Sequence, residues 1–247
     1  MATSSTGAEA QAAECCGECS WLFAGLGREA LAKLREMCRT LRFERHHLIF
    51  EEGEPAYGLY IICKGKVKLA KHSLKGKKQI LKLLGPGEIL GEKTMFDREV
   101  YTAYAETLED TTVHFIEREP FLEFLREHPE VALRLIEKLS RELKAFQGKL
   151  MEASYEGSLE RLARLLLLMS RRYGRETEKG LDIGIQLSRQ ELAELAGIST
   201  ETAIRVLARM KERGLIALEG SKIYILDREG LGELAGPFFI ALKENLL

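Results

Sequence analysis

LSRQELAELAGISTETAIRVLARMKERG, residues 187–214, is the stretch that decides the fold of the C-terminal part of this chain. Ser188 followed by Glu191 is the pattern of a capping box, which predicts that a first helix begins there. Gly197 can take the left-handed conformation that ends this helix, and Ser199 can cap a second one. The stretch therefore predicts two short helices joined by a tight turn.

The second of these helices is predicted to have a buried face and a polar face. Its apolar residues recur at helical spacing and form the buried stripe: Ala203, Val206, Leu207 and Met210. A helix-turn-helix protein presents the opposite, polar face of such a helix to the major groove of DNA. We therefore predict a DNA-binding surface made of Arg189, Ser199, Thr200, Glu201, Ile204, Arg205 and Arg209.

The chemistry of this surface suits base recognition. Arg205 can donate two hydrogen bonds to O6 and N7 of guanine, and Glu201 can accept one from the amino group of cytosine. The alternative is an ordinary solvated helix, in which Glu201 and Arg205 form an i,i+4 ion pair worth roughly 0.2–0.5 kcal/mol. The small-residue turn, the two caps and the buried stripe together favour DNA binding.

Composition limits the class of protein without identifying it. The chain has 247 residues, enough for two domains, and a formal net charge of −1. Residues 156–226 contain 12 Lys and Arg against 10 Asp and Glu, so the DNA-binding prediction depends on where the charges lie and not on their sum. No apolar run approaches the roughly 18–20 residues of a membrane span. We expect a globular protein of the reducing cytoplasm, because five cysteines without a secretory signal do not resemble a disulfide framework.

Residues 41–116 are predicted to form a β-roll. Short β-type runs are separated by glycines, with strands expected at 59–63, 67–71, 79–84, 101–106 and 111–116. Many short strands with regular turns are typical of a small barrel, a double-stranded β-helix or a jelly-roll-like fold. A helix is expected before them at 27–40, where Cys38 continues the apolar stripe, and Cys63 is expected in the core of a strand.

A long helix is predicted after Pro129, following a short one at 120–127. It carries apolar residues separated alternately by four and three positions, a heptad pattern typical of helix pairing. The alternative, a helix packed only on its own roll, fits Leu133 and Leu135. We predict a homodimer whose seam consists of Ile136, Leu139, Leu143, Phe146 and Leu150.

The predicted architecture is an α+β chain of five parts. A cysteine-containing tail (1–20) precedes the β-roll effector domain (21–128), and the dimerisation helix with its hinge follows (129–156). Gly157 interrupts the long helix, and Ser158 can cap a new helix at 159–172. A winged helix-turn-helix domain (157–236) then includes two strands around Gly220 and Ser221, and a C-terminal tail (237–247) completes the chain, with a further helix expected within 231–247.

This order of elements resembles the Crp/Fnr family of bacterial transcription regulators. The resemblance covers roughly residues 22–236 and is carried by GLYIICKGKVKL (58–69), PGEILGE (86–92) and the opening stretch. It implies that Glu201 and Arg205 recognise a G·C pair in a palindrome of double-stranded DNA related to TTGA…TCAA. Thr200 stands where catabolite-activator proteins have Arg, and Ile204 stands where the Fnr branch often has Ser, which leaves the outer bases open. The resemblance also implies RNA polymerase as a partner, with residues 72–78 and 170–180 as candidate contacts.

The same resemblance places an effector pocket in the roll. Gly91 and Glu92 match the Gly-Glu pair of cyclic-nucleotide-binding members, but Tyr101 and Thr102 stand where those members have an Arg and a hydroxyl residue that hold the phosphate. On the long helix, the paired hydroxyl residues that contact the purine correspond to Phe146 and Gln147. A cyclic phosphate without a cation would be poorly held, so the sequence does not favour cyclic AMP as effector.

The N-terminal cysteines suggest a second kind of effector. Fnr-type sensors ligate an iron–sulfur cluster with cysteines in this region, where the chain has Cys15, Cys16 and Cys19, and with one Cys in the roll, which aligns with His114. Adjacent cysteines rarely bind one metal, so a free cysteine tail is the alternative to an iron–sulfur or zinc site.

Two classes of function remain open. The first is a DNA-binding regulator controlled through the roll, and the second is a redox- or small-molecule-sensing roll whose C-terminal domain binds protein instead. No nucleophile–base pair, phosphate loop or paired-carboxylate motif favours an enzyme.

Overall fold

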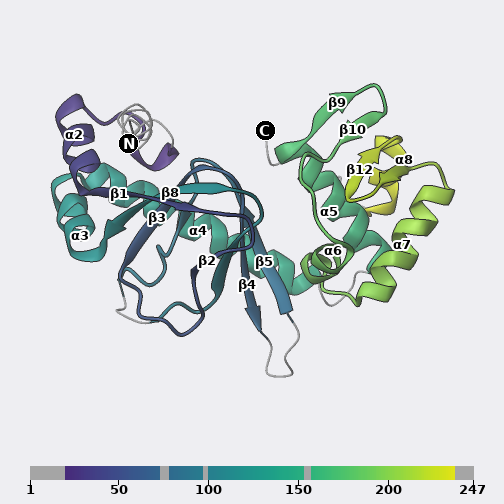
Figure 1. Cartoon of the computed structure of the whole chain (residues 1–247), viewed down its shortest axis with the longest axis horizontal. Coiled ribbons are helices and arrows are strands. Elements are labelled where there is room, and N and C mark those ends of the chain that lie inside the picture. The colour runs from purple at the N-terminus through teal and green to yellow at the C-terminus, as the bar shows by residue number, and fades with distance from the viewer. Residues whose placement is uncertain (1–19, 73–77, 97–99, 153–156, 237–247) are drawn as a thin grey trace, which may run out of the picture. The chain divides into compact units, whose positions relative to one another are not determined.

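Residues 20–72, 78–96, 100–152 and 157–236 are described by the computed structural model of the chain (Figure 1). They divide into two compact units, one ending at Phe146 and the other beginning at Gln147. Among these residues, no helix combines the length and apolar character needed to cross a membrane.

The N-terminal unit contains two four-stranded antiparallel sheets. Their strands are β1 (Cys38–Phe43), β2 (Leu48–Phe50), β3 (Gly58–Lys64), β4 (Val67–His72), β5 (Lys78–Leu84), β6 (Ile89–Leu90), β7 (Tyr104–Thr107) and β8 (Thr111–Glu117). One sheet has the order β1-β8-β3-β6 and the other β2-β7-β4-β5. Because neighbouring strands in a sheet come from distant parts of the sequence, the arrangement is the predicted jelly-roll-like β-roll.

Strand β3 has two buried faces, which explains its nearly continuous apolar sequence. Ile62 contributes to a core that also contains residues of the second sheet, among them Phe50, Val67 and Ala105. Ile61, one position earlier, belongs to a different cluster because side chains alternate across a strand.

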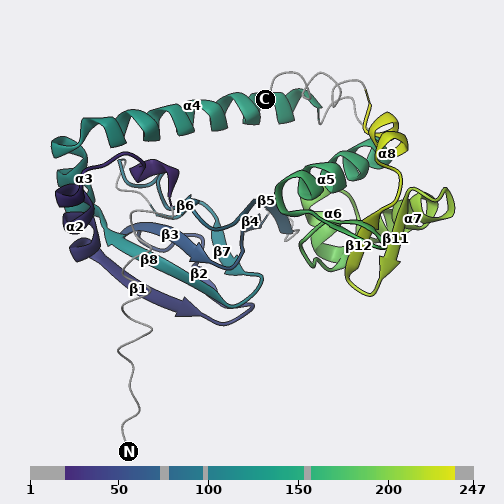
Figure 2. The same ribbon diagram turned by 90° about the horizontal axis from the view of Figure 1, so that it is seen from above.

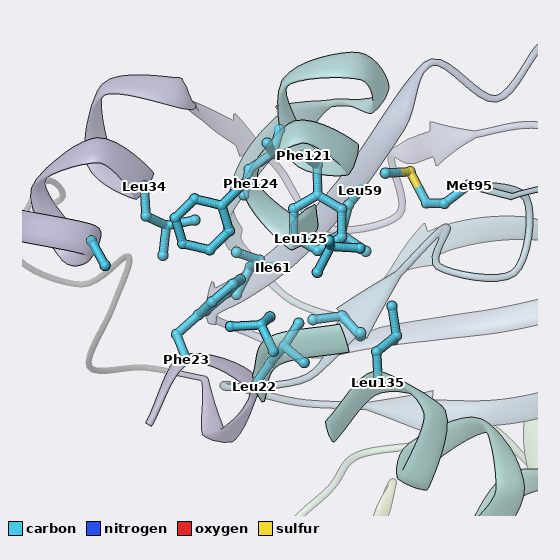
Figure 3. Close-up of a cluster of buried hydrophobic side chains, with 14 residues drawn as sticks. Leu22, Phe23, Leu34, Leu59, Ile61, Met95, Phe121, Phe124, Leu125 and Leu135 are labelled. Carbon is cyan, nitrogen blue, oxygen red and sulfur yellow. The ribbon is translucent and has the colours of Figure 1, made fainter. Parts of the chain in front are cut away.

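That second cluster joins the first sheet to the helices of the unit. These are the short 3-10 helix η1 (Trp21–Phe23), α2 (Arg28–Met37), α3 (Arg118–Glu127) and the first half of α4 (Pro129–Glu152). Figure 3 shows Phe23, Phe121 and Phe124 lying together beside Ile61. The rings of Phe23 and Phe121 pack edge to face, with centroids 6.5 Å apart. The cluster therefore attaches α4 to the roll.

Helix α4 presents two different faces (Figure 2). Val131, Leu135, Lys138 and Glu142, spaced by four, three and four residues, are buried or half-buried against the roll. Ile136, Leu143 and Phe146 are exposed, which makes them an apolar row on the surface of this unit. Of the two residues expected to pack on the roll, Leu135 does so, but Leu133 is 61% exposed and that prediction is wrong.

The C-terminal unit is built on α5 (Ser158–Tyr173). It continues with the hairpin β9 (Arg175–Thr177) and β10 (Gly180–Asp182), the helices α6 (Arg189–Ala196) and α7 (Thr200–Glu212), the hairpin β11 (Ile216–Glu219) and β12 (Lys222–Ile225), and α8 (Arg228–Leu234). The four strands form one sheet in the order β11-β12-β10-β9. This is the predicted winged helix-turn-helix, so the α+β architecture of both units is confirmed.

Several element boundaries differ from the sequence prediction. Helix α2 ends at Met37, and Cys38 begins β1 instead of continuing the helix, because the backbone from Cys38 onward pairs with β8. Strand β7 begins at Tyr104, three residues later than expected. Helix α8 begins at Arg228, where the Asp227 side chain accepts from the Gly230 N–H, and residues 237–247 lie outside the described residues.

The start of α5 also differs in its capping. Gly157, and not Ser158, is the N-cap, and its N–H donates to the Glu160 carboxylate at 2.8 Å. Residues 170–180, a candidate polymerase contact, include the end of α5 and the strand β9, which pairs with β10.

Substituting Phe121→Ala is expected to lower the free energy of unfolding of the N-terminal unit by about 3–5 kcal/mol, because it leaves a cavity in a fully buried cluster. The fluorescence of Trp21, the chain's one tryptophan, reports this transition during chemical denaturation because η1 packs on the same cluster. Leu81→Ala, on the exposed side of β5, is the control. Equal losses in the two variants would contradict the assigned core.

Candidate nucleic-acid interface and effector pocket

Helix α6 begins with the predicted capping box. The Ser188 hydroxyl accepts from the Glu191 N–H at 3.1 Å, and the Ser188 N–H donates to the Glu191 carboxylate at 2.9 Å. Two backbone donors that helix geometry leaves unpaired are thereby satisfied. The start of α6 is therefore fixed by Ser188 and Glu191, two residues that are three positions apart in the sequence.

The turn after α6 depends on Gly197. Its backbone is left-handed, with φ of 64° and ψ of 39°, a conformation that costs other residues more than glycine. The Ile198 N–H then donates back to the Ala193 carbonyl at 3.0 Å. Ser199 follows as N-cap of α7 and accepts from the Thr202 N–H at 3.2 Å. Both caps and the glycine turn lie where the sequence predicted them.

Helix α7 has the predicted buried stripe and leaves the opposite face open. Ala203, Val206, Leu207 and Met210 are buried, while Glu201, Ile204, Arg205 and Arg209 are exposed and Thr200 is half-buried. The exposed side chains lie three and four residues apart, so they share one face of the helix. The structure thus gathers the predicted recognition residues on one surface of α7.

Glu201 and Arg205 are available to a ligand on this face. In the part of the chain that the structure describes, no ion pair joins them, so the alternative of a self-satisfied i,i+4 pair is not observed. Hydrogen bonds from its own backbone N–H and from Ser199 lower the pKa of the Glu201 carboxyl, which keeps it an ionised acceptor.

Arg189 links α6 to the wing. Its Nη2 donates to the Gly220 carbonyl at 3.2 Å, and Gly220, with φ of 59°, forms the turn between β11 and β12. Burial lowers the pKa of its guanidinium, and its buried Nη1 has no protein hydrogen-bond partner. Because a guanidinium carries five donors, Arg189 can hold the wing and still offer a donor to a phosphate.

The wing tip contains two candidate DNA contacts that the predicted DNA-binding surface did not include. Ser221 and Lys222 are exposed beside the turn, and the Ser221 hydroxyl donates to Gln186 at 3.3 Å. The Gly-Ser-Lys sequence of this turn, between two apolar strands, could have predicted these two residues as DNA contacts.

The predicted effector pocket is only partly assembled. Gly91, Glu92 and Tyr101 come together: a Cβ on Gly91 would lie 3.4 Å from the Tyr101 ring, and the Tyr101 hydroxyl donates to the Gly58 carbonyl at 3.3 Å. Thr102 is exposed, as are Phe146 and Gln147 on α4, and no described contact joins these three to Glu92.

Glu92 is paired with a cation that the sequence analysis did not predict. The buried Glu92 carboxylate accepts from the ammonium of Lys138 on α4. Lys138 is three residues after the buried Leu135, which is itself four residues after the buried Val131. This helical spacing could have predicted from the sequence that Lys138 faces the roll. The carboxylate that matches the Gly-Glu pair of cyclic-nucleotide-binding members is therefore paired with a lysine of the same unit.

Of the residues proposed as metal ligands, only His114 lies in the part of the chain that the structure describes. Cys15, Cys16 and Cys19 lie outside the described residues. His114 is buried in the middle of the first sheet, where its Nδ1 lies 3.0 Å from the Thr40 hydroxyl. Within the described ranges no group of three or more histidine, cysteine or acidic side chains could hold a metal ion. The metal site that includes the three cysteines stays a prediction.

Comparison with known proteins agrees with this two-unit organisation. Residues 40–128 match the model of the cyclic nucleotide-binding domain, and residues 160–234 match that of the Crp-like helix-turn-helix domain. The chain is 32% identical to the CRP-like cAMP-activated global transcriptional regulator of Mycobacterium tuberculosis, over 87% of this chain and 96% of that protein. It is 30% identical to the anaerobic regulatory protein of Bacillus subtilis, over 80% and 84% of the two chains. The crystal structure of the Thermus thermophilus catabolite activator protein superposes with a TM-score of 0.51 at 33% identity and covers 87% of this chain and 97% of its own.

Roll and helix-turn-helix together define a DNA-binding transcription regulator with an effector-type domain, and the proteins it resembles are regulators and not enzymes. The chain belongs to the Crp/Fnr family.

Ser188→Ala should lower the stability of α6 by about 0.5–2 kcal/mol, because the Glu191 N–H loses its acceptor. Native-state hydrogen exchange of the α6 amides measures this loss, and Ser221→Ala at the wing is the matched control. Unchanged exchange in α6 would mean that the capping box does not set the start of this helix.

Proposed function

We propose that this chain is a homodimeric transcription regulator that binds a palindrome related to TTGA…TCAA. The observation that carries the proposal is the exposed pair Glu201 and Arg205 at the N-terminal end of a capped helix. An arginine there can donate two hydrogen bonds to guanine, and an ionised carboxylate one turn earlier can accept from the paired cytosine. Residues one turn apart on one face can address the two bases of a single pair.

Contacts around this pair would position it on DNA. Thr200 lies at the first turn of α7, where the helix dipole favours a phosphate oxygen. Two further arginines would contact the phosphates on either side of this base pair. They are Arg209, one turn after Arg205, and Arg189, beside the wing. Such phosphate contacts fix the register of the helix on the duplex without selecting a sequence.

The exposed row on α4 supports a homodimer. Ile136, Leu143 and Phe146 are 58%, 60% and 65% exposed, and Leu139 lies between them, partly buried against the roll core. Leu150 continues the spacing, but its side chain is outside the described residues. An apolar row at heptad spacing stabilises a helix pair, and a second copy of the same helix supplies a matching row.

The roll is the site at which we expect a signal to act. The names of the two relatives point to different signals. The Mycobacterium tuberculosis protein is named as cAMP-activated, and the Bacillus subtilis protein is named as an anaerobic regulatory protein. For this chain a small molecule at the roll and a redox change at Cys15, Cys16 and Cys19 are the two kinds of signal consistent with its residues. We expect RNA polymerase to be the partner on promoter DNA, with residues 72–78 and 170–180 as candidate contacts.

Arg205→Ala is expected to weaken binding to the palindrome by about 1–3 kcal/mol per half-site and to abolish the preference for one G·C pair. Fluorescence anisotropy with the palindrome and with probes substituted at that pair measures both effects. Arg209→Ala is the matched control, for which affinity should fall equally on all probes. Retained preference in the Arg205 variant would overturn its assignment to base recognition.

Ile136→Glu is expected to convert the dimer to a monomer, because it places a charge in an apolar seam. Sedimentation velocity measures the change, and DNA affinity should fall with it because two half-sites are no longer bound together. The control is Leu81→Glu, a similarly exposed leucine on β5. If the Ile136 variant remains a dimer, the seam is assigned to the wrong face of α4.

A further inference from the structure

The roll-facing stripe of α4 changes character along its length. Val131 and Leu135 belong to the apolar cluster between the roll and the helices. The next two positions of the same stripe are Lys138 and Glu142, and Lys138 is only 7% exposed. Burying charged side chains is costly unless they are paired and hydrogen-bonded. The arrangement therefore requires partners that the roll supplies.

Those partners come from three places in the unit. Lys138 donates to Glu92, in the turn after β6, and at 2.7 Å to Glu142, one turn along α4. Lys82 on β5 donates to the same Glu142 oxygen, also at 2.7 Å. Lys93 lies 3.5 Å from the other Glu142 oxygen. Two lysines thus share one carboxylate oxygen and a third lies near the other, and the network ties α4 to both sheets of the roll.

The Glu142 carboxylate is the centre of this network. Burial by itself would raise its pKa, but the hydrogen bonds from Lys138 and Lys82 outweigh burial and lower that pKa to about 2. The Glu142 side chain is therefore charged at neutral pH, as its ion pairs with Lys138 and Lys82 require.

The turn that carries Glu92 is held rigidly. Gly91 has φ of 83°, and a Cβ there would lie 2.7 Å from the Gly58 carbonyl, so only glycine fits against β3. The Thr94 hydroxyl donates to the Gly91 carbonyl at 3.0 Å. Glu92 follows this turn directly, and a ligand hydroxyl would compete with the Lys138 ammonium for the oxygen that the two share.

We propose that Lys138 is an internal occupant of the effector pocket: its ion pair with Glu92 holds α4 on the roll, so that DNA binding requires no cyclic nucleotide. This inference rests on the proposed function, because it concerns how that DNA-binding dimer is kept competent. The Lys138 side chain is 7% exposed, and its ammonium end is paired with the Glu92 carboxylate. Lys138 immediately precedes the seam residue Leu139 in the sequence. Its ion pair with Glu92 therefore also fixes which face of α4 is turned outward.

The first test needs no substitution. DNA affinity of the full-length protein is measured by anisotropy on the palindrome, with and without cyclic AMP at about 1 mM, a concentration that would saturate even weak sites. We expect the same affinity in both conditions. Tighter DNA binding by tenfold or more with cyclic AMP would overturn the proposal, because the pocket would then accept the ligand. If the protein binds no palindrome in either condition, the proposed function itself fails.

The second test removes the link. Lys138→Met keeps a stem of similar length without the charge, and Glu92→Gln removes the other partner. Each variant is expected to lose DNA affinity by roughly 5–150-fold, the usual range of coupling between distant sites, while Lys64→Met on the exposed end of β3 should match the unsubstituted protein. Trp21 fluorescence confirms that the unit remains folded. Folded Lys138 and Glu92 variants that bind the palindrome as tightly as the Lys64 variant would overturn the proposal.

Discussion

The left-handed turn at Gly197 is the constraint on which the DNA-binding unit depends. With φ of 64° it reverses the chain within a few residues, so α7 lies against α6, and its residues Ala203, Val206 and Leu207 are buried. That packing decides which side of α7 is left outside. Glu201 and Arg205 are exposed because the opposite positions are buried, and the caps at Ser188 and Ser199 fix where both helices begin. The exposure of Glu201 and Arg205 to DNA therefore follows from the backbone geometry of the turn and of the two helix caps.

Local patterns of this kind were predictable from sequence, whereas features that depend on distant partners were not. The capping box, the glycine turn and the buried stripe of α7 involve residues a few positions apart, and each was found where predicted. Cys38 was assigned to a helix because its apolar spacing continued that of α2, but pairing with β8 determines its backbone conformation. Lys138 was missed for the same reason, since its partner Glu92 is 46 positions away in the sequence.

Helix α4 has to satisfy two demands at once. One stripe packs on the roll through Val131 and Leu135 and then through the ion pairs of Lys138 and Glu142. The adjacent stripe carries the exposed Ile136, Leu143 and Phe146. Both stripes belong to one helix. A change in how the first stripe packs on the roll therefore also changes the direction in which the second, exposed stripe faces. A change at the roll can therefore reach a paired helix without any contact with DNA.

Selection of bound sites from a random DNA library by the full-length protein tests the central claim most directly. The account predicts enrichment of a two-fold symmetric site with TTGA-like half-sites, their centres about 10 bp or one helical turn apart, because two copies of α7 must enter successive major grooves. Enrichment of a single unpaired half-site, or of no sequence, would contradict it.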